Sequence, residues 1–354
     1  LVLLDHNGGG ARTDMAGLLR RFGFDVREMG GASGCPSHDI EPMDNALDDA
    51  VKELESMGRG FGVVYDFDAD RGTMVFTENG VATALGPQYT CALNEYAMLG
   101  LYASNTAYRG RPLVVVINDN TSGSSKIIAQ RFASELGIDV RIAEVETGEV
   151  NVVEKMEMIR REKSGIPVIG IEGSCGGVIF GGEKDAATSR DGTLTALMAA
   201  SLILRTGQHL DAIVATLPRF YTTFESIRGI TAGDVAVKSG LEREFKRRLR
   251  MRPDGTFTVD GIDGCAYRRY DIIHYIGTEV HRTMEKDASG GYKIRLIDTE
   301  GNESFVWYRD SKTELRVYAE TDATRELEDA QLFQMLRGAV FAANEAAELA
   351  AGKA

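Results

Sequence analysis

Three carboxylates that follow a short apolar segment are the residues of this chain best suited to hold a divalent cation. Residues 61–65 read Phe-Gly-Val-Val-Tyr, and Asp66, Asp68, Asp70 and then Arg71 come directly after them. Carboxylates at this spacing repel one another unless a cation neutralises them, and hard oxygen ligands suit Mg²⁺. A Mg²⁺ ion held by aspartates favours a phosphorylated substrate, although a solvated turn would have the same sequence.

Other metal and nucleotide motifs do not fit the chain. An EF-hand loop needs Gly at its sixth position and Glu at its twelfth, where Arg71 and Thr77 stand. The segment Asn7–Gly10 has Thr13 in place of the last Gly of G-x-G-x-x-G, and no P-loop string occurs. The four cysteines form no C-x-x-C pair and the five histidines no zincin motif. We interpret these cysteines and histidines as structural residues.

A second polar string lies near the C-terminus, at residues 309–314. Arg309 offers a bidentate fork, Ser311 and Thr313 offer hydroxyl groups, and a tight loop offers backbone N–H groups. Together with Lys312, these groups predict a cradle for a phosphate dianion. An ordinary hairpin turn is the alternative.

A glycine-rich segment provides the third candidate. Residues 172–177 read Glu-Gly-Ser-Cys-Gly-Gly, and Arg190-Asp191-Gly192 precedes an apolar helical run. Glycines let the backbone approach a ligand closely, and Glu172 and Ser174 can bond sugar hydroxyls. A simple turn between two strands would also be rich in glycine.

The elements that must position these loops change in character along the chain. The expected strands of the first part lie at residues 1–5, 24–28, 61–65, 112–117, 138–143 and 167–172, with helices at 14–22, 44–57, 89–104, 126–136, 152–161 and 193–206. Later strands are expected at 256–259, 292–296, 304–308 and 315–319, with helices at 240–251 and 323–349. Alternating strands and helices are typical of parallel sheets, and strands joined by turns are typical of antiparallel ones.

The sequence therefore predicts an α/β fold with three domains. Two tandem three-layer α/β/α domains with mainly parallel sheets, at residues 1–84 and 85–214, precede an α+β domain with an antiparallel sheet at 215–354.

Composition narrows the possible partners and compartment. The 354 residues carry a formal net charge of −13, which argues against nucleic-acid binding because phosphate backbones need a basic footprint. No apolar run approaches the roughly 20 residues that span a bilayer, so no membrane partner is expected. Four scattered cysteines are typical of reduced thiols and predict a cytoplasmic protein.

The order of these motifs resembles the α-D-phosphohexomutase family, which includes phosphoglucomutases, phosphomannomutases and phosphoglucosamine mutases. Five segments carry the resemblance. In the family's second domain, Leu4–Gly10 is similar to the strand and glycine turn, Ile40–Pro42 to the P-E-P segment and Asp66–Arg71 to the metal loop D-G-D-x-D-R. Val145–Glu149 loosely resembles a T-x-V-G-D segment of the third domain, and Arg309–Glu314 resembles the phosphate loop R-x-S-G-T-E-P of the fourth. Phe67, Lys312 and Leu315 depart from those patterns.

The resemblance implies an isomerase that moves a phosphoryl group between the 1- and 6-positions of a hexose through a phosphoserine and a bisphosphate. It implies these roles: Asp66, Asp68 and Asp70 as Mg²⁺ ligands, Arg71 as the catalytic residue that steadies the transferring phosphoryl group, Arg309, Ser311, Lys312 and Thr313 as ligands of the other phosphate, and Glu172 and Ser174 as sugar-binding residues. The sequence identifies no general base, no preferred hexose and no oligomeric state.

Two departures from the family limit what the resemblance implies. The sugar loop G-E-x-S-G aligns either on Glu172 and Ser174 or on the glycines, which would put Gly173 and Cys175 at those two positions. The serine loop T-A-S-H-N-P has no counterpart in the chain. We therefore expect residues 1–354 to correspond to the second to fourth domains, with the serine domain as an intramolecular partner outside them and no turnover without it.

Two other interpretations stay open at this point. A haloacid-dehalogenase-like sugar phosphatase also places D-x-D after an apolar strand, with Asp66 as nucleophile and Asp68 as acid. That family has Thr or Val where Asp70 stands. A non-catalytic protein that binds sugar phosphates would fit a native chain without the serine domain.

Overall fold

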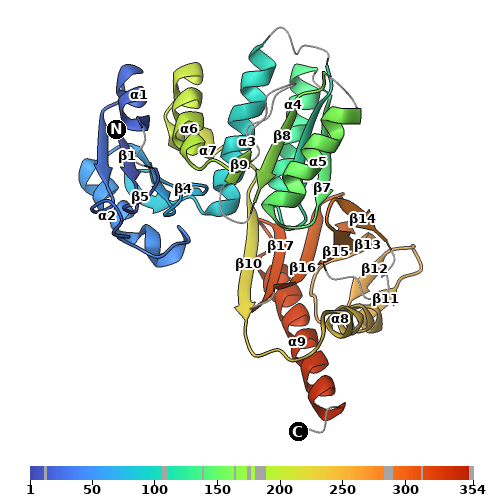
Figure 1. Cartoon of the computed structure of the whole chain (residues 1–354). Coiled ribbons are helices and arrows are strands. Elements are labelled where there is room, and N and C mark those ends of the chain that lie inside the picture. Colours follow the sequence, from blue (N-terminus) through green and yellow to red (C-terminus); the bar gives the residue numbers. More distant parts are fainter. Residues whose placement is uncertain are drawn as a thin grey trace. The chain divides into compact units, whose positions relative to one another are not determined.

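The structure is a computed structural model that describes residues 1–11, 14–105, 111–137, 139–162, 165–173, 177–179, 189–282, 290–311 and 314–350. Internal packing divides the chain into two compact units. The first comprises residues 1–143 and 148–218, and the second comprises 144–147 and 219–354. Figure 1 shows both units and labels many of their helices and strands. The three domain ranges expected from the sequence stay a prediction.

The first unit begins with a five-stranded mixed sheet in the order β2-β1-β3-β4-β5. β1 is parallel to β2 and β3, and β4 is antiparallel to β3 and β5. The elements of this part are β1 (Val2–Asp5), α1 (Met15–Arg21), β2 (Val26–Met29), a 3-10 turn (Asp44–Leu47), α2 (Asp48–Met57), β3 (Phe61–Tyr65), β4 (Gly72–Glu78) and β5 (Val81–Ala84). The acidic segment 66–71 is the connection from β3 to β4.

Both faces of this sheet are buried, because helices pack on each of them. Successive side chains of a strand point to opposite faces. Val63 and Tyr65 of β3 lie in the large core cluster that also holds Leu19 of α1. Val64 lies in a separate cluster with Leu54 of α2. The sheet is therefore the middle of three layers.

A second sheet completes the first unit, in the order β7-β6-β8-β9. β6 and β8 are parallel, and β9 is antiparallel to β8. Its elements are α3 (Pro87–Ser104), β6 (Leu113–Asn118), α4 (Ser124–Leu136), β7 (Val140–Val145), α5 (Glu149–Glu162), β8 (Val168–Glu172), β9 (Gly177–Ile179), α6 (Thr193–Thr206) and α7 (Leu210–Val214). Ile117 and Ile171 belong to the same core cluster as Val63, so one core joins the two sheets.

The second unit is built on an antiparallel sheet in the order β10-β17-β16-β15-β13-β12-β11, with β14 paired to β13. Its elements are β10 (Phe220–Ile227), α8 (Asp234–Arg248), β11 (Leu249–Met251), β12 (Phe257–Val259), β13 (Tyr267–Ile276), β14 (Glu279–His281), β15 (Gly291–Asp298), β16 (Glu303–Ser311), β17 (Glu314–Asp322) and α9 (Glu326–Ala350). Phe245 of α8 and Leu336 of α9 share a core cluster with Val306 and Val317 of the sheet. Of the expected phosphate loop, Arg309 and Ser311 lie at the end of β16, and Glu314 begins β17.

The predicted fold class is confirmed, with differences in detail. Residues 72–84 form two antiparallel strands for which no element was expected. The helix expected from residue 240 to 251 begins instead at Asp234 and ends at Arg248. Val237, Leu241 and Phe245 are buried and follow one another by four residues, so they form one apolar stripe of the helix. This stripe begins before residue 240, where the helix was expected to start.

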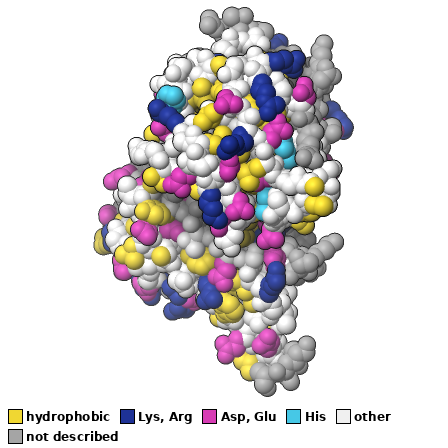
Figure 2. Space-filling view, turned by 90° about the vertical axis from the view of Figure 1, so that its left-hand side faces the viewer, with side chains coloured by type: hydrophobic (Ala, Val, Ile, Leu, Met, Phe, Trp, Pro, Cys, Tyr) yellow, Lys and Arg dark blue, Asp and Glu magenta, His cyan; other side chains and the backbone are white. Residues whose placement is uncertain are grey.

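The surface carries charges of both signs. On the face drawn in Figure 2, acidic and basic side chains lie interspersed, so the net charge of −13 does not collect in one region of that face. No helix in the described ranges is both long enough and apolar enough to cross a membrane.

The layer formed by α2 gives a stability prediction. Leu54 is fully buried against the first sheet, so Leu54→Ala leaves a cavity and should lower the free energy of unfolding by about 2–5 kcal/mol. Leu204→Ala on α6, where the side chain is 54% exposed, is the matched control and should change it by less than about 0.5 kcal/mol. Urea denaturation measures both, and equal effects would contradict the assigned packing.

Candidate functional site

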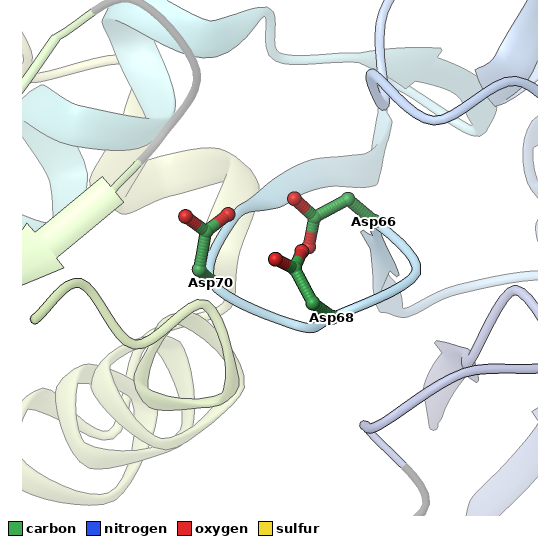
Figure 3. A group of neighbouring side chains, drawn as sticks. All are labelled: Asp66, Asp68 and Asp70. Atoms are coloured by element: carbon green, nitrogen blue, oxygen red, sulfur yellow. The ribbon is translucent and has the colours of Figure 1, made fainter.

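The connection between β3 and β4 gathers the three predicted metal ligands. One oxygen from each of Asp66, Asp68 and Asp70 lies within 4.8 Å of the others. Figure 3 shows the carboxylates on one short loop, with those of Asp66 and Asp68 turned toward each other. Asp66 is fully buried, and Oδ1 of Asp70 is buried without a hydrogen bond among the described residues. This donor set fits a hard divalent cation.

Glycines on either side bring backbone against this metal loop (residues 66–71). The N–H of Gly10 donates to the carbonyl of Phe67 at 2.7 Å, and the N–H of Gly192 donates to the carbonyl of Ala69 at 3.0 Å. A Cβ on Gly9 would lie 1.9 Å from the Phe67 carbonyl oxygen. The glycine run after β1 thus allows close packing against the metal loop.

Arg71 closes the metal loop on itself. Its Nε donates to Oδ2 of Asp66 at 2.6 Å, and its backbone N–H donates to Oδ1 of the same residue at 3.1 Å. Its Nη1 donates to Glu41, in the segment that resembles P-E-P, at 3.2 Å. Nε also lies 3.3 Å from Oδ1 of Asp70. The predicted catalytic arginine is therefore oriented by three carboxylates.

The pKa values of Asp66 and of the half-buried Asp70 shift in opposite directions. Burial, together with the neighbouring Asp70, raises the pKa of Asp66 to about 7, and Arg71 lowers it only in part. Burial also raises the pKa of Asp70, but Asp66, Arg190 and Arg71 outweigh it, and the net shift is downward. The loop thus has more carboxylate than its arginines neutralise, as a cation site requires.

Glu172 ends β8 with both carboxylate oxygens engaged. Oε1 accepts from Nδ2 of Asn118 at 2.7 Å, and Oε2 accepts from Nη1 of Arg190 at 2.8 Å. Asn118 also accepts from the N–H of Gly173 at 2.9 Å. Glu172 is 2% exposed, so a sugar hydroxyl would have to compete with these donors for its carboxylate. Ser174, the other predicted sugar-binding residue, lies outside the described residues.

Two residues of this site received no role from the sequence. Asn118 ends β6 and Arg190 precedes α6, and each binds the carboxylate of Glu172. Arg190 also bonds Asp70, so it joins the metal loop to the end of β8. A polar residue directly after a buried parallel strand is the signal that would have identified Asn118.

The predicted phosphate residues lie in the second unit. Nη2 of Arg309 is 3.1 Å from Oε1 of Glu146, and Glu146 also accepts from the N–H of Gly277 at 2.8 Å. The hydroxyl of Ser311 donates to the carbonyl of Glu314 at 2.7 Å and so holds the β16–β17 turn. Lys312 and Thr313 lie outside the described residues.

Comparison with known proteins finds similarity to enzymes that act as phosphosugar mutases. Residues 98–221 match the model of the phosphoglucomutase/phosphomannomutase α/β/α domain III. A probable phosphoglucosamine mutase of Methanopyrus kandleri is 24% identical over 292 residues, 80% of this chain. A phosphoglucomutase/phosphomannomutase of Thermococcus kodakarensis is 27% identical over 296 residues, 83% of this chain. The chain is similar in sequence to these mutases, and one of its segments matches their domain III.

Solved structures of the α-D-phosphohexomutase superfamily share the fold. The N-acetylphosphoglucosamine mutase of Aspergillus fumigatus, in complex with GlcNAc-6P and magnesium, superposes with a TM-score of 0.53 at 12% identity and covers 96% of this chain. An apo-form N-acetylglucosamine-phosphate mutase gives 0.52 at 13% identity over 95% of this chain. The chain spans 56% and 58% of the lengths of the two sequence relatives, and 65% and 60% of the two solved chains.

A buried carboxyl group lies beneath the loop that Asn118 begins. Glu95 of α3 is fully buried beside Ser125, in the first turn of α4. Burial raises the pKa of Glu95 to about 8, and the Ser125 hydroxyl lowers it only in part. The side chain is therefore neutral in the folded protein at neutral pH.

This burial predicts a pH dependence of stability. The folded-state pKa of Glu95 lies above its ordinary value of 4.5, so its contribution is complete below that value and is lost as the pH rises through about 8. Relative to Glu95→Gln, the wild type should lose up to about 1.4 kcal/mol of unfolding free energy per pH unit in this range. Urea denaturation between pH 6 and pH 9 measures the difference. Glu135→Gln, at an exposed position of α4, should show none.

Proposed function

We propose that this chain supplies the metal, sugar and phosphate loops of a phosphohexomutase that interconverts hexose 1-phosphates and 6-phosphates. The observation that carries the proposal is the triad Asp66, Asp68 and Asp70, which lies at the end of β3 with Arg71 folded back on it. Its relatives are mutases, and their names include both phosphoglucosamine mutase and phosphoglucomutase/phosphomannomutase.

In this proposal the residues of the first unit orient and neutralise the reacting phosphate. Mg²⁺ held by the triad would supply a Lewis acid for a phosphoryl oxygen. Arg71 presents a guanidinium group whose position is set by Asp66 and Glu41 before a phosphoryl group arrives. Glu172, held by two donors, accepts from a sugar hydroxyl, with Ser174 as its partner from the same loop.

The second unit would hold the phosphate that does not react. Arg309 and Ser311 are separated by one residue near the end of β16, with Lys312 and Thr313 next in the chain. A guanidinium fork, a hydroxyl and backbone N–H groups in a tight turn are the donors that a phosphate dianion takes. The hydroxyl of Ser311 donates to the carbonyl of Glu314, which ties the end of β16 to the start of β17.

The contacts of Asp66 disfavour the phosphatase alternative. A nucleophilic aspartate must present a carboxylate oxygen to phosphorus. Asp66 is fully buried, and each of its oxygens accepts a hydrogen bond from Arg71. These contacts support a role as a ligand rather than as a nucleophile.

The activity is tested on the full-length natural protein. Glucose, mannose and glucosamine 1-phosphates are incubated with Mg²⁺ and catalytic hexose 1,6-bisphosphate, and the products are followed by phosphorus NMR. We expect the corresponding 6-phosphate without net inorganic phosphate. Release of inorganic phosphate would identify a phosphatase, and binding without conversion a non-catalytic binder.

The site assignment is tested by a pair of substitutions. Asp68→Asn removes an exposed candidate ligand and should raise the Mg²⁺ dissociation constant by about tenfold or more. Arg309→Ala should weaken binding of a hexose phosphate by about 10- to 100-fold, because a hydrogen bond to a charged group contributes about 1.5–3 kcal/mol. Isothermal titration calorimetry measures both ligands on both variants. The assignment is wrong if each variant impairs both ligands equally.

A further inference from the structure

One arginine contacts three carboxylates from different segments of the first unit. Nη2 of Arg190 bonds Oδ2 of Asp70, and Nη1 donates to Oε2 of Glu172 at 2.8 Å. Nε lies 3.5 Å from Oε2 of Glu149, at the start of α5. The backbone N–H of Arg190 donates to the other oxygen of Glu149 at 2.8 Å. All three nitrogens of the guanidinium group thus face acidic partners.

The chain around Arg190 is fixed independently of these ion pairs. A Cβ on Gly177 of β9 would lie 2.4 Å from Cδ of Arg190, so glycine there makes room for the arginine stem. The next residue, Asp191, donates its N–H to the carbonyl of Val178 at 2.9 Å. Gly192 then donates to Ala69 of the metal loop. The side chain of Arg190 is 17% exposed.

We propose that Arg190 is the positioning residue of this site, and that its guanidinium group fixes Asp70 of the metal loop relative to Glu172 of the sugar loop. This inference rests on the proposed function. Arg190 need not touch the metal or the sugar. It acts through Asp70, whose carboxylate it orients, and through Glu172, whose carboxylate it shares with Asn118.

The chemistry of the three contacts requires arginine rather than lysine. A guanidinium group is planar and presents its donors in a fixed fork, whereas a lysine ammonium is a single point charge on a flexible stem. Lysine at this position keeps the positive charge but cannot hold two carboxylates from two directions at fixed separation. Arg190→Lys therefore separates positioning from charge.

The test is a double-mutant cycle that reads metal binding. Mn²⁺ replaces Mg²⁺, and electron paramagnetic resonance measures its dissociation constant in the wild type, Arg190→Lys, Glu172→Gln and the double variant. We expect Arg190→Lys to raise the constant about tenfold, as loss of a partner of a metal ligand does. Glu172→Gln should raise it in the wild type but not in the Arg190→Lys background, because Arg190 links Glu172 to Asp70.

A matched control and a second variant distinguish a failure of the proposed role of Arg190 from a failure of the metal site itself. Arg59→Lys alters another arginine–carboxylate pair of the same unit, 3.2 Å from Asp211, and should leave Mn²⁺ binding unchanged. Glu149→Gln loosens Arg190 from outside the metal loop and should weaken Mn²⁺ binding in the same direction, even if Arg190→Lys folds poorly. Additive effects, or unchanged binding in Arg190→Lys, overturn the role of Arg190 while the mutase proposal stands. Absence of Mn²⁺ binding in the wild type overturns the metal site and this inference together.

Discussion

The repulsion among the carboxylates at the end of β3 is the constraint on which the site depends. Asp66, Asp68 and Asp70 bring an oxygen each to within 4.8 Å of the others. Arg71 and Arg190 offset part of that charge, and the backbone of Gly10 and Gly192 is hydrogen-bonded to the same loop. Residues far apart in the sequence therefore meet at one acidic loop. The arginines offset its negative charge, and the glycines let backbone pack closely against it.

A second buried carboxylate shows what full compensation looks like in this protein. Asp271 of β13 accepts from Arg269, Arg282 and Arg295 at 2.6, 2.7 and 2.9 Å. Burial alone would raise the pKa of Asp271, but the arginines lower it to about 2. At the metal loop, burial and the neighbouring Asp70 raise the pKa of Asp66 to about 7, and Arg71 lowers it only in part. An acidic cluster left short of positive charge is typical of a site that binds a cation.

The sequence predicted the framework well where apolar segments were long, and less well where pairing depended on partners. The helix expected at 193–206 has those bounds in the structure, because its apolar residues fill the core on most sides. β4 and β5 were not expected because they form a hairpin whose pairing to β3 is set by tertiary contacts. The metal triad could be predicted because its three aspartates lie within five residues of the sequence. Asn118 and Arg190 were not assigned roles, because their partners lie 54 and 18 residues away in the chain.

Pairing of the candidate binding residues with carboxylates also bears on how anions would be selected. Arg71 is held by Asp66 and Glu41, and Arg309 lies beside Glu146. An anion that reaches such an arginine exchanges with a carboxylate already present, so its net affinity is a difference between two ion pairs. A dianionic phosphate with three oxygens competes better in this exchange than a carboxylate or a monovalent anion. The acidic partners that seem to block these arginines are therefore a physical basis for preferring phosphate esters.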